Sequence, residues 1–499
     1  MSDNRRHYFL KLLTNVVKIP VFFLLESFFS RILGPKAYGN YNFLNDSLSK
    51  IVGFFDSGIS MGFYTKFSSN TKDLKLLKSF WFIVFLFSVI FLLFIACSSL
   101  FRFNKVIWPE QHLLYIYLSA IFSLMTFYTV ICSKILDATR LTILSEKMRM
   151  IQMLISILVF VFIFFFLTSL SLDQFYLIQI ILLSLLVFGT AIIMNRSEMS
   201  LIPKVHLNTA DLKKYLKNFY IYSKPFFIYS LFTTLFGLYE RWLLQYYSGS
   251  IEQAYIGLAL KVGSIIFIFS SAMIPILLRE ISISFGENDI KRINHLFYKN
   301  YKILFLLASV ISCIIFFNAK TVVLLLGGSE YINSVDVVKV LSIFPVYQTI
   351  GQINSSLYYT TNRVKLYSTI SIAILPISTL FNYFLIAPKI GNGLELGAIG
   401  LALQMVLSQI LVQNILLYFN TKFLNLSFYK LLLTQVIVLS IFFLIGYIVQ
   451  HLLTLVLLNS VLELSVFSFA LILGTSFIVY FNPAFLGFEN RKEIFNLFK

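Results

Sequence analysis

Charged residues are scarce in this sequence. Asp, Glu, Lys and Arg make up only 12% of the 499 residues, whereas 58% are hydrophobic and the mean hydropathy is +0.84. A soluble protein has about 25% charged residues, so the polar residues present here could not cover a soluble surface. Apolar runs longer than the ~18 residues that cross a bilayer as a helix recur along the whole chain. Because the alternating pattern of an outer-membrane barrel is absent, the composition predicts an all-α polytopic membrane protein.

The residue types that build catalytic and metal sites are also rare. Cys97, Cys132 and Cys313 lie far apart in or beside apolar runs, without CxxC or metal-ligand spacing. The five histidines are scattered near loops or termini, and there is no Walker lysine loop, HExxH or Gly-x-Ser-x-Gly motif. We therefore expect a transporter rather than an enzyme, with no metal and no bound cofactor. Its energy would come from an ion gradient (H⁺ or Na⁺), the membrane potential or downstream consumption of the product.

The net charge of +18 arises from cations in short segments between the apolar runs. A nucleic-acid-binding protein would gather its cations on one folded face, so no nucleic-acid partner is expected. Most of the 40 Lys and Arg residues fall in loops on the side of the two termini, and the positive-inside rule places that side in the cytoplasm. The cations predicted on the opposite side are Arg31, Lys36, Arg102, Lys105, Lys320 and Lys389.

The apolar runs predict about fourteen transmembrane helices, divided after the sixth by a basic cytoplasmic loop at 196–218. We expect an N-lobe at 1–200, a cytoplasmic linker at 201–218, a C-lobe at 219–420, and two further helices with a cytoplasmic C-terminus at 421–499. Two six-helix lobes would be parallel repeats, and the segments 37–39 and 254–257 place Ala-Tyr and a glycine in matching loops. The predicted spans are 8–33, 41–65, 79–101, 112–136, 150–170, 174–195, 219–247, 251–284, 301–319, 335–361, 364–387, 396–420, 429–451 and 459–481.

Four stretches, in order along the chain, resemble polysaccharide flippases of the Wzx type. They are "RILGPKAYGNYNF" at 31–43, "YERWLLQYYSGSIEQAYIGLALKVGSIIFIFSSAMIPILLREIS" at 239–282, "LLLGGSEYINSVDVVKVLSIFPVYQTIGQINSSLYYTTNRVKLY" at 324–367 and "FNYFLIAPKIGNGLELGAIGLALQMVLSQ" at 381–409. That family belongs to the MOP exporter superfamily, together with the lipid II flippase and the MATE exporters. The resemblance implies two six-helix lobes in a V-shaped, MATE-like arrangement, plus two C-terminal helices.

The resemblance also implies a function in the bacterial inner (plasma) membrane. A monomeric flippase would move undecaprenyl-pyrophosphate-linked oligosaccharide repeat units from the inner to the outer leaflet by alternating access. These lipid-linked oligosaccharides would serve O-antigen and lipopolysaccharide, capsule or exopolysaccharide biosynthesis. The implied protein partners are a polysaccharide polymerase and a chain-length regulator.

Charged residues inside the predicted helices are the candidate functional residues. Each costs about 2.5–3.5 kcal/mol at mid-helix on insertion scales, so it should face a partner or a wet cavity. Cations match pyrophosphate through charge-assisted hydrogen bonds, and carboxylates titrate when they are desolvated. The candidates for substrate binding are Lys18, Lys50, Lys261, Arg241 and Arg31, and those for ion coupling are Glu26, Asp46, Asp56 and Glu240.

A purely structural interpretation of these charges stays open. Asp46 and Lys50, four residues apart, could neutralise one another, as could the Asp336–Lys339 pair. Lys18 lies near a helix end and could snorkel to the interface. Because adjacent residues do not face each other on a helix, Glu240 and Arg241 should point in different directions.

Two other functional classes compete with the flippase. A MATE-like, cation-coupled small-molecule exporter shares the helix count but would favour an acid-rich lobe interior. A polysaccharide polymerase or ligase would carry a large periplasmic loop with catalytic Arg or His, whereas the longest outer loops here are about 102–111 and 320–334. The flippase is therefore the leading hypothesis.

Overall fold

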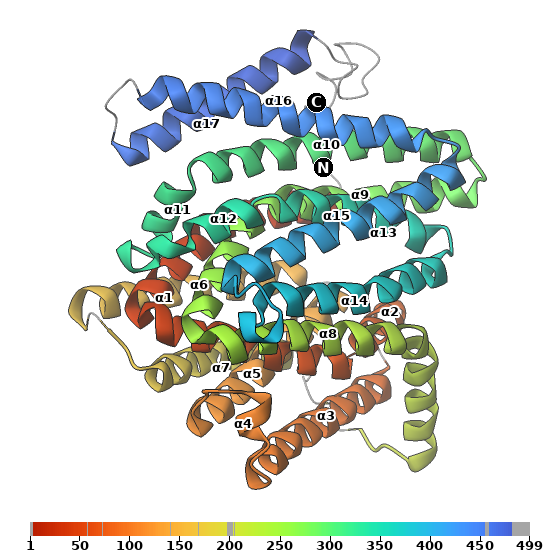
Figure 1. The fold of residues 1–499 in the computed structure, drawn as a ribbon. Coiled ribbons are helices and arrows are strands. Elements are labelled where there is room, and N and C mark those ends of the chain that lie inside the picture. Colours follow the sequence, from red (N-terminus) through yellow and green to blue (C-terminus); the bar gives the residue numbers. More distant parts are fainter. Residues whose placement is uncertain are drawn as a thin grey trace. The chain divides into compact units, whose positions relative to one another are not determined.

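The computed structural model describes residues 3–481, except 57, 72, 140, 168, 197–202, 204 and 455–458. All regular elements in these described ranges are helices (Figure 1), which confirms the all-α prediction. Eight of the described helices are long and apolar enough to cross a membrane. The prediction of fourteen spans is compatible with the observed helices and stays a prediction.

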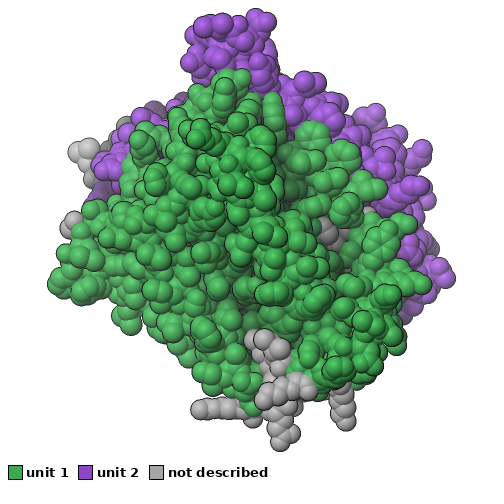
Figure 2. All heavy atoms as spheres, turned by 90° about the horizontal axis from the view of Figure 1, so that it is seen from below, with its two compact units in different colours: residues 1–254 green, residues 255–499 purple. Residues whose placement is uncertain are grey.

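By its packing the chain divides into two compact units, Met1–Ala254 and Tyr255–Lys499, which are coloured separately in Figure 2. The division falls within one long helix, α8 (Thr209–Gly263), so most of α8 packs with the first unit. The lobes expected from the sequence were defined by helix count and charge. That division stays a prediction.

The first unit is built from eight helices among its described residues. These helices lie around α5, which contacts α1, α2, α3, α6 and α7. Aromatic side chains fill the core; for example, the rings of Phe63 and Phe80 stack with their centroids 4.0 Å apart. The helices are α1 (Asp3–Asp56), α2 (Ile59–Ser69), α3 (Leu74–Leu100), α4 (Asn104–Ile107), α5 (Leu113–Ala138), α6 (Thr142–Phe166), α7 (Leu172–Arg196) and the greater part of α8.

The second unit packs around α10 (Ile290–Phe317), which contacts α9, α13 and α16. Buried amides join its helices: Asn354 Nδ2 donates to the Gln413 carbonyl at 3.0 Å, and Gln435 Nε2 donates to the Tyr301 hydroxyl at 2.8 Å. Such bonds hold apolar helices in register within a membrane. The other elements are η1 (Ser264–Ile266), α9 (Phe267–Gly286), α11 (Ala319–Leu326), η2 (Ser329–Ser334), α12 (Val335–Leu341), α13 (Phe344–Thr360), α14 (Val364–Ile386), η3 (Lys389–Gly391), α15 (Gly397–Leu424), α16 (Phe428–Thr454) and α17 (Ser460–Phe481).

Three predicted spans are interrupted in the structure. The expected helix over 41–65 ends at Asp56, and α2 begins only after Gly58, whose φ of 86° is left-handed. The expected helix over 251–284 contains the 3-10 turn η1, and the one over 335–361 is divided between α12 and α13. Gly58 lies at the first break and Pro345 lies in the first turn of α13, so a glycine and a proline mark two of the three interruptions.

Gly39 allows a close backbone approach between α1 and α8 in the first unit. A Cβ atom built at this position would lie 1.7 Å from the Ser250 carbonyl oxygen and 3.2 Å from the Ala254 nitrogen. These are backbone atoms, so no side-chain rotation could relieve the overlap. Ser250 and Gln111 also donate hydrogen bonds to the Asn40 side chain, the latter at 2.8 Å. The contact between α1 and α8 therefore depends on a residue without a side chain.

We predict that Gly39→Ala destabilises the protein by about 1–3 kcal/mol, because overpacking forces the two backbones apart. Gly53→Ala is the matched control. Gly53 lies in the same helix with nothing within 4 Å of its Cβ position, so that substitution should be neutral or slightly stabilising. Thermal unfolding of the purified protein in detergent measures both. Equal transition temperatures for the two variants would show that the close approach is unimportant.

Candidate functional site

Two long helices of the first unit carry the same backbone break. Helix α1 turns at Gly34 (φ 69°, ψ 170°), and α8 turns at Gly249 (φ 78°, ψ −172°). A positive φ is accessible to glycine without the steric cost that a Cβ atom brings. The two breaks support the predicted repeat. However, when the two helices are aligned on Gly34 and Gly249, the Ala-Tyr pair of α8 lies two residues further along than that of α1. The glycines, rather than the Ala-Tyr pairs, therefore define the register of the repeat.

In this register each helix closes its break with a buried pair of side chains. Tyr38 donates its hydroxyl hydrogen to Glu26 at 2.9 Å, across the turn in α1. Arg241 Nη1 donates to Gln253 Oε1 at 3.1 Å across the turn in α8, and Gln253 Nε2 donates back to the Arg241 carbonyl at 2.6 Å. Both pairs join residues twelve positions apart. Equivalent positions therefore hold an acid in α1 and a base in α8.

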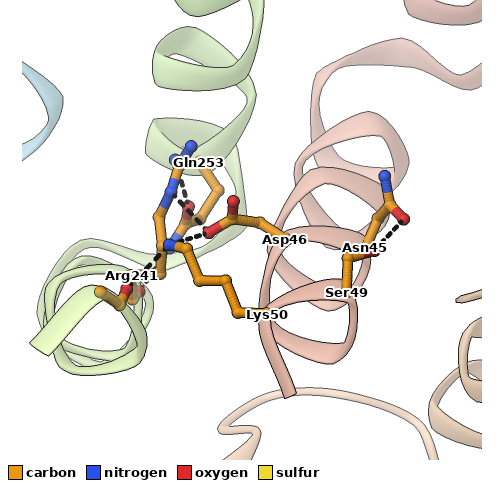
Figure 3. A network of polar contacts seen from close by, with 7 residues as sticks. Asn45, Asp46, Ser49, Lys50, Arg241 and Gln253 are labelled. Carbon is orange, nitrogen blue, oxygen red and sulfur yellow. Dashed lines mark hydrogen bonds and ion pairs between the residues drawn. The ribbon is translucent and has the colours of Figure 1, made fainter. Parts of the chain in front are cut away.

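The second segment of α1 joins this arrangement through a shared carboxylate. Lys50 Nζ donates to Asp46 Oδ2 at 2.6 Å, and Arg241 Nε lies 3.2 Å from the same oxygen. Figure 3 shows Asp46 and Lys50 pointing from α1 towards Arg241 and Gln253 on α8, whereas Asn45 and Ser49 point away. We call Asp46, Lys50, Arg241 and Gln253 the charge cluster.

A glycine of α8 makes room for the lysine of the charge cluster. Lys50 Nζ donates a second hydrogen bond to the Gly237 carbonyl at 3.0 Å. A Cβ atom at Gly237 would lie 3.3 Å from both Cε and Nζ of Lys50. The ammonium group therefore lies directly against the α8 backbone.

The charge cluster is partly open and carries one net positive charge. The side chains of Lys50 and Asp46 are 32% and 30% exposed, whereas that of Arg241 is 9% exposed. Two cations share one carboxylate, and a guanidinium has five N–H donors in a fixed fork, of which two are used here. This arrangement can accept a further anion, and phosphate oxygens match both donors.

Asp56 belongs to a separate group at the end of α1. Its two carboxylate oxygens accept hydrogen bonds from the Ser60 backbone N–H at 2.9 Å and the Ser60 hydroxyl at 2.6 Å. Lys134 of α5 donates to the Ser60 hydroxyl and lies 3.9 Å from Asp56. These contacts bridge the α1–α2 break and tie it to α5, which accounts for Asp56 structurally.

The other predicted site residues are not part of the charge cluster. Glu26 is buried with Tyr38, as described, and Arg31 is exposed. Glu240 is half-buried, whereas its neighbour Arg241 is buried, so the two side chains do point in different directions. Lys18 lies in α1 but its side chain is outside the described residues, and Lys261 lies in the part of α8 that belongs to the second unit.

Both ion pairs that the spacing predicted are present in the structure. Asp46 pairs with Lys50, and Lys339 Nζ lies 3.2 Å from Asp336 Oδ1. Sequence reasoning missed Tyr38 and Gln253, since an uncharged residue gives no signal in an apolar run. Aligning the two helices on Gly34 and Gly249 would have revealed both, because each lies four residues after its glycine.

Comparison with known proteins finds solved structures of similar fold. No protein-family model matches the chain, and no curated protein sequence matches it. An inward-facing multidrug resistance MATE family transporter of the MOP superfamily aligns with a TM-score of 0.67 at 12% identity, covering 82% of this chain and 95% of its own. The lipid II flippase MurJ, in an inward closed conformation, aligns with a TM-score of 0.67 at 16% identity, covering 93% of this chain and 98% of its own.

A third solved structure has the same fold. A MOP superfamily transporter from Pyrococcus furiosus Vc1 aligns with a TM-score of 0.55 at 12% identity, covering 84% of this chain and 95% of its own. At these identities the likeness shows the fold alone. The chain thus has the MATE- and MurJ-like fold of multi-pass MOP-superfamily transporters.

We predict that Asp46→Asn destabilises the protein by about 1–3 kcal/mol. The loss lies between that of an exposed ion pair and that of a fully buried one, because two cations would lose a partly exposed carboxylate. Adding Lys50→Gln should restore part of the loss, which a double-mutant cycle of thermal unfolding in detergent would measure. Asp336→Asn, at the exposed Asp336–Lys339 pair, is the control and should change stability little. Strict additivity of Asp46→Asn and Lys50→Gln would contradict the shared carboxylate.

Proposed function

We propose that this protein is a flippase of the bacterial inner membrane. It moves undecaprenyl-pyrophosphate-linked oligosaccharide repeat units, as used for O-antigen, capsule or exopolysaccharide, from the inner to the outer leaflet by alternating access. The observation that carries the proposal is the charge cluster, in which two cations share one carboxylate inside a MOP-superfamily fold. A polymerase and a chain-length regulator would act on the product, and the flippase itself would work as a monomer.

The charge cluster binds the pyrophosphate by exchange of hydrogen-bond partners. Lys50 Nζ has three donors, two of which go to Asp46 and the Gly237 carbonyl. Gln253 accepts a hydrogen bond from the Arg241 guanidinium and donates one to the Arg241 backbone carbonyl. The guanidinium is therefore oriented before an anion arrives. Phosphate oxygens take the free donors first and then compete with Asp46. Arg31, Lys18 and Lys261 are proposed to contact the head group along its path.

Protonation of carboxylates is the proposed source of coupling. A proton on Asp46 removes the negative charge that repels the phosphate and weakens its hold on Lys50 and Arg241. Glu26 is buried against a tyrosine hydroxyl, so it is the second proposed coupling site, for H⁺ or Na⁺. Glu240 remains a further candidate, while Asp56 is assigned a structural role.

The net positive charge of the charge cluster favours the flippase function over the export of cationic drugs. A MATE-like, cation-coupled exporter has the same fold, and the fold comparisons support both functions equally. An exporter of cationic compounds needs an excess of carboxylates where its cargo binds, whereas the charge cluster has an excess of cations. We therefore favour an anionic cargo.

We predict that Lys50→Ala and Arg241→Ala each reduce flipping by about tenfold or more, since a charge-assisted hydrogen bond is worth about 1.5–3 kcal/mol. Lys50→Arg should retain more activity than Lys50→Ala. The measurement is the amount of lipid-linked oligosaccharide that stays on the cytoplasmic leaflet after depletion of the wild-type protein and expression of each variant. Lys339→Ala, which removes a lysine from an exposed ion pair elsewhere, is the matched control.

Three results would count against different parts of the proposal. Depletion of the protein without accumulation of cytoplasm-facing lipid-linked oligosaccharide would exclude the flippase function. If Lys18→Ala, Lys50→Ala and Lys261→Ala all retained full transport, the assignment of these cations to the substrate path would fail, although the function could stand. Proton-driven export of cationic drugs from vesicles would instead support the MATE-like alternative.

A further inference from the structure

A large apolar cavity lies within the first unit, next to the charge cluster. Its volume is about 520 Å³. We call it the slot. Its lining is mostly aliphatic and aromatic, and Ser47 and Thr234 are the only small polar residues in it. The lining consists of Phe43, Ser47, Ile51, Phe54 and Phe55 of α1, Ile90 and Phe94 of α3, Val106 and Ile107 of α4, Trp108 after α4, and Leu231, Thr234, Leu235, Leu238, Tyr239 and Trp242 of α8.

The slot is elongated along the helices. The lining residues of α8 recur on one helical face from Leu231 to Trp242, and those of α1 from Phe43 to Phe55. At a rise of 1.5 Å per residue, each stripe is about 16–18 Å long, or three helix turns. A rounded cavity of 520 Å³ would be shorter than three turns. Its shape therefore suits an extended chain better than a compact molecule.

One side of the slot is open, and that side is apolar. Leu235 is 54% exposed and Val106 is 64% exposed, and Ile90 and Phe94 of α3 are each 41% exposed. Helix α3 is one of the helices apolar enough to span a membrane, so this side faces hydrocarbon rather than water. Membrane lipid thus has direct access to the slot.

Two cations precede, in sequence, the α4 residues that line one end of the slot. Helix α4 forms this end, and the Trp242 indole N–H donates to the Val106 carbonyl at 2.7 Å, which ties α8 to it. Arg102 and Lys105, just before Val106, are exposed and have no ion-pair partner within the described residues. The nearby carboxylate, Glu110, accepts a hydrogen bond from Gln245 at 3.4 Å. The positive-inside prediction places this end at the periplasmic face.

We propose that the slot binds one acyl chain of an anionic phospholipid, whose phosphate lies at Arg102 and Lys105. The chain lies along α1 and α8, and the head group stays at the level of α4. An anionic phospholipid fits better than a neutral one because two unpaired cations flank the end of the slot. The head group of this lipid is held by α4 rather than by the charge cluster, so the site does not rest on the proposed function.

Two of the three tryptophans of the chain, Trp108 and Trp242, line the slot. Trp242 is partly exposed, so the reporter protein carries Trp81→Phe and Trp242→Phe and its fluorescence comes only from Trp108. Trp108 is 1% exposed, so lipid that merely surrounds the protein cannot reach it. We predict that vesicles of phosphatidylglycerol with brominated acyl chains quench this fluorescence strongly, by about half or more, relative to unbrominated vesicles.

A blocked slot provides the first control. Ser47→Phe puts a ring into the slot and should relieve the quenching, whereas Ser49→Phe, on the same helix but exposed and outside the lining, should not. Equal quenching in these two variants, both checked for cooperative thermal unfolding, would overturn the proposal. If Ser47→Phe fails to fold, the head-group variants below still decide the question.

The head-group contact is tested in the unblocked protein. Brominated phosphatidylglycerol should quench at lower mole fraction than brominated phosphatidylcholine. Arg102→Gln with Lys105→Gln should abolish that preference, while Lys36→Gln, at another exposed cation of the first unit, should leave it unchanged. A preference that survives in the double variant would reject the phosphate contact. Relief of quenching by a small fraction of unbrominated undecaprenyl phosphate would identify a polyprenyl chain as the occupant instead of a phospholipid.

Discussion

The shared carboxylate of Asp46 is the interaction on which the rest of the first unit's site depends. Within a membrane an unpaired charge is costly, so Lys50 and Arg241 require a counter-charge, and one oxygen of Asp46 serves both. The contact is possible only because α1 and α8 come close together. Gly39 removes the side chain that would meet the α8 backbone, and Gly237 leaves space for the lysine. Glycines thus create the distances at which the charges are neutralised.

The two broken helices also show how a repeat acquires different chemistry in its two copies. The same turn holds Glu26 against Tyr38 in α1 and Arg241 against Gln253 in α8. In each case a neutral partner across the turn orients the charged side chain without cancelling its charge. An acid is suited to binding a proton or a cation, whereas a base is suited to a phosphate. A single backbone framework therefore holds an acid in one copy and a base in the other, which is the difference that the proposed coupling ion and anionic cargo require.

The sequence predicted the all-α membrane class, because composition and long apolar runs depend on few structural details. It also predicted the pairing of Asp46 with Lys50, since residues four apart on a helix lie on one face. Gly58, where α2 begins, is a glycine within a predicted span and could be expected to break it, whereas the 3-10 turn η1 has no such signal of its own. Gln253 escaped prediction because an uncharged polar residue acquires its role only from the turn at Gly249. The contact between Arg241 and Asp46 likewise could not be predicted, because the two residues are distant in sequence and only the fold brings them together.

The charge cluster and the slot use the same helix turns but different faces of them. Each of the three charged members of the charge cluster is followed in sequence by a residue of the slot: Asp46 by Ser47, Lys50 by Ile51 and Arg241 by Trp242. Successive residues are rotated by about 100° around an α-helix, so polar and apolar surfaces adjoin without merging. Because the backbone is common to both, the lining of the slot supports the turns that hold the charges. Because the side chains diverge, a substitution at Ser47 changes the slot and one at Lys50 changes the charge cluster, so the two proposed roles can be tested separately.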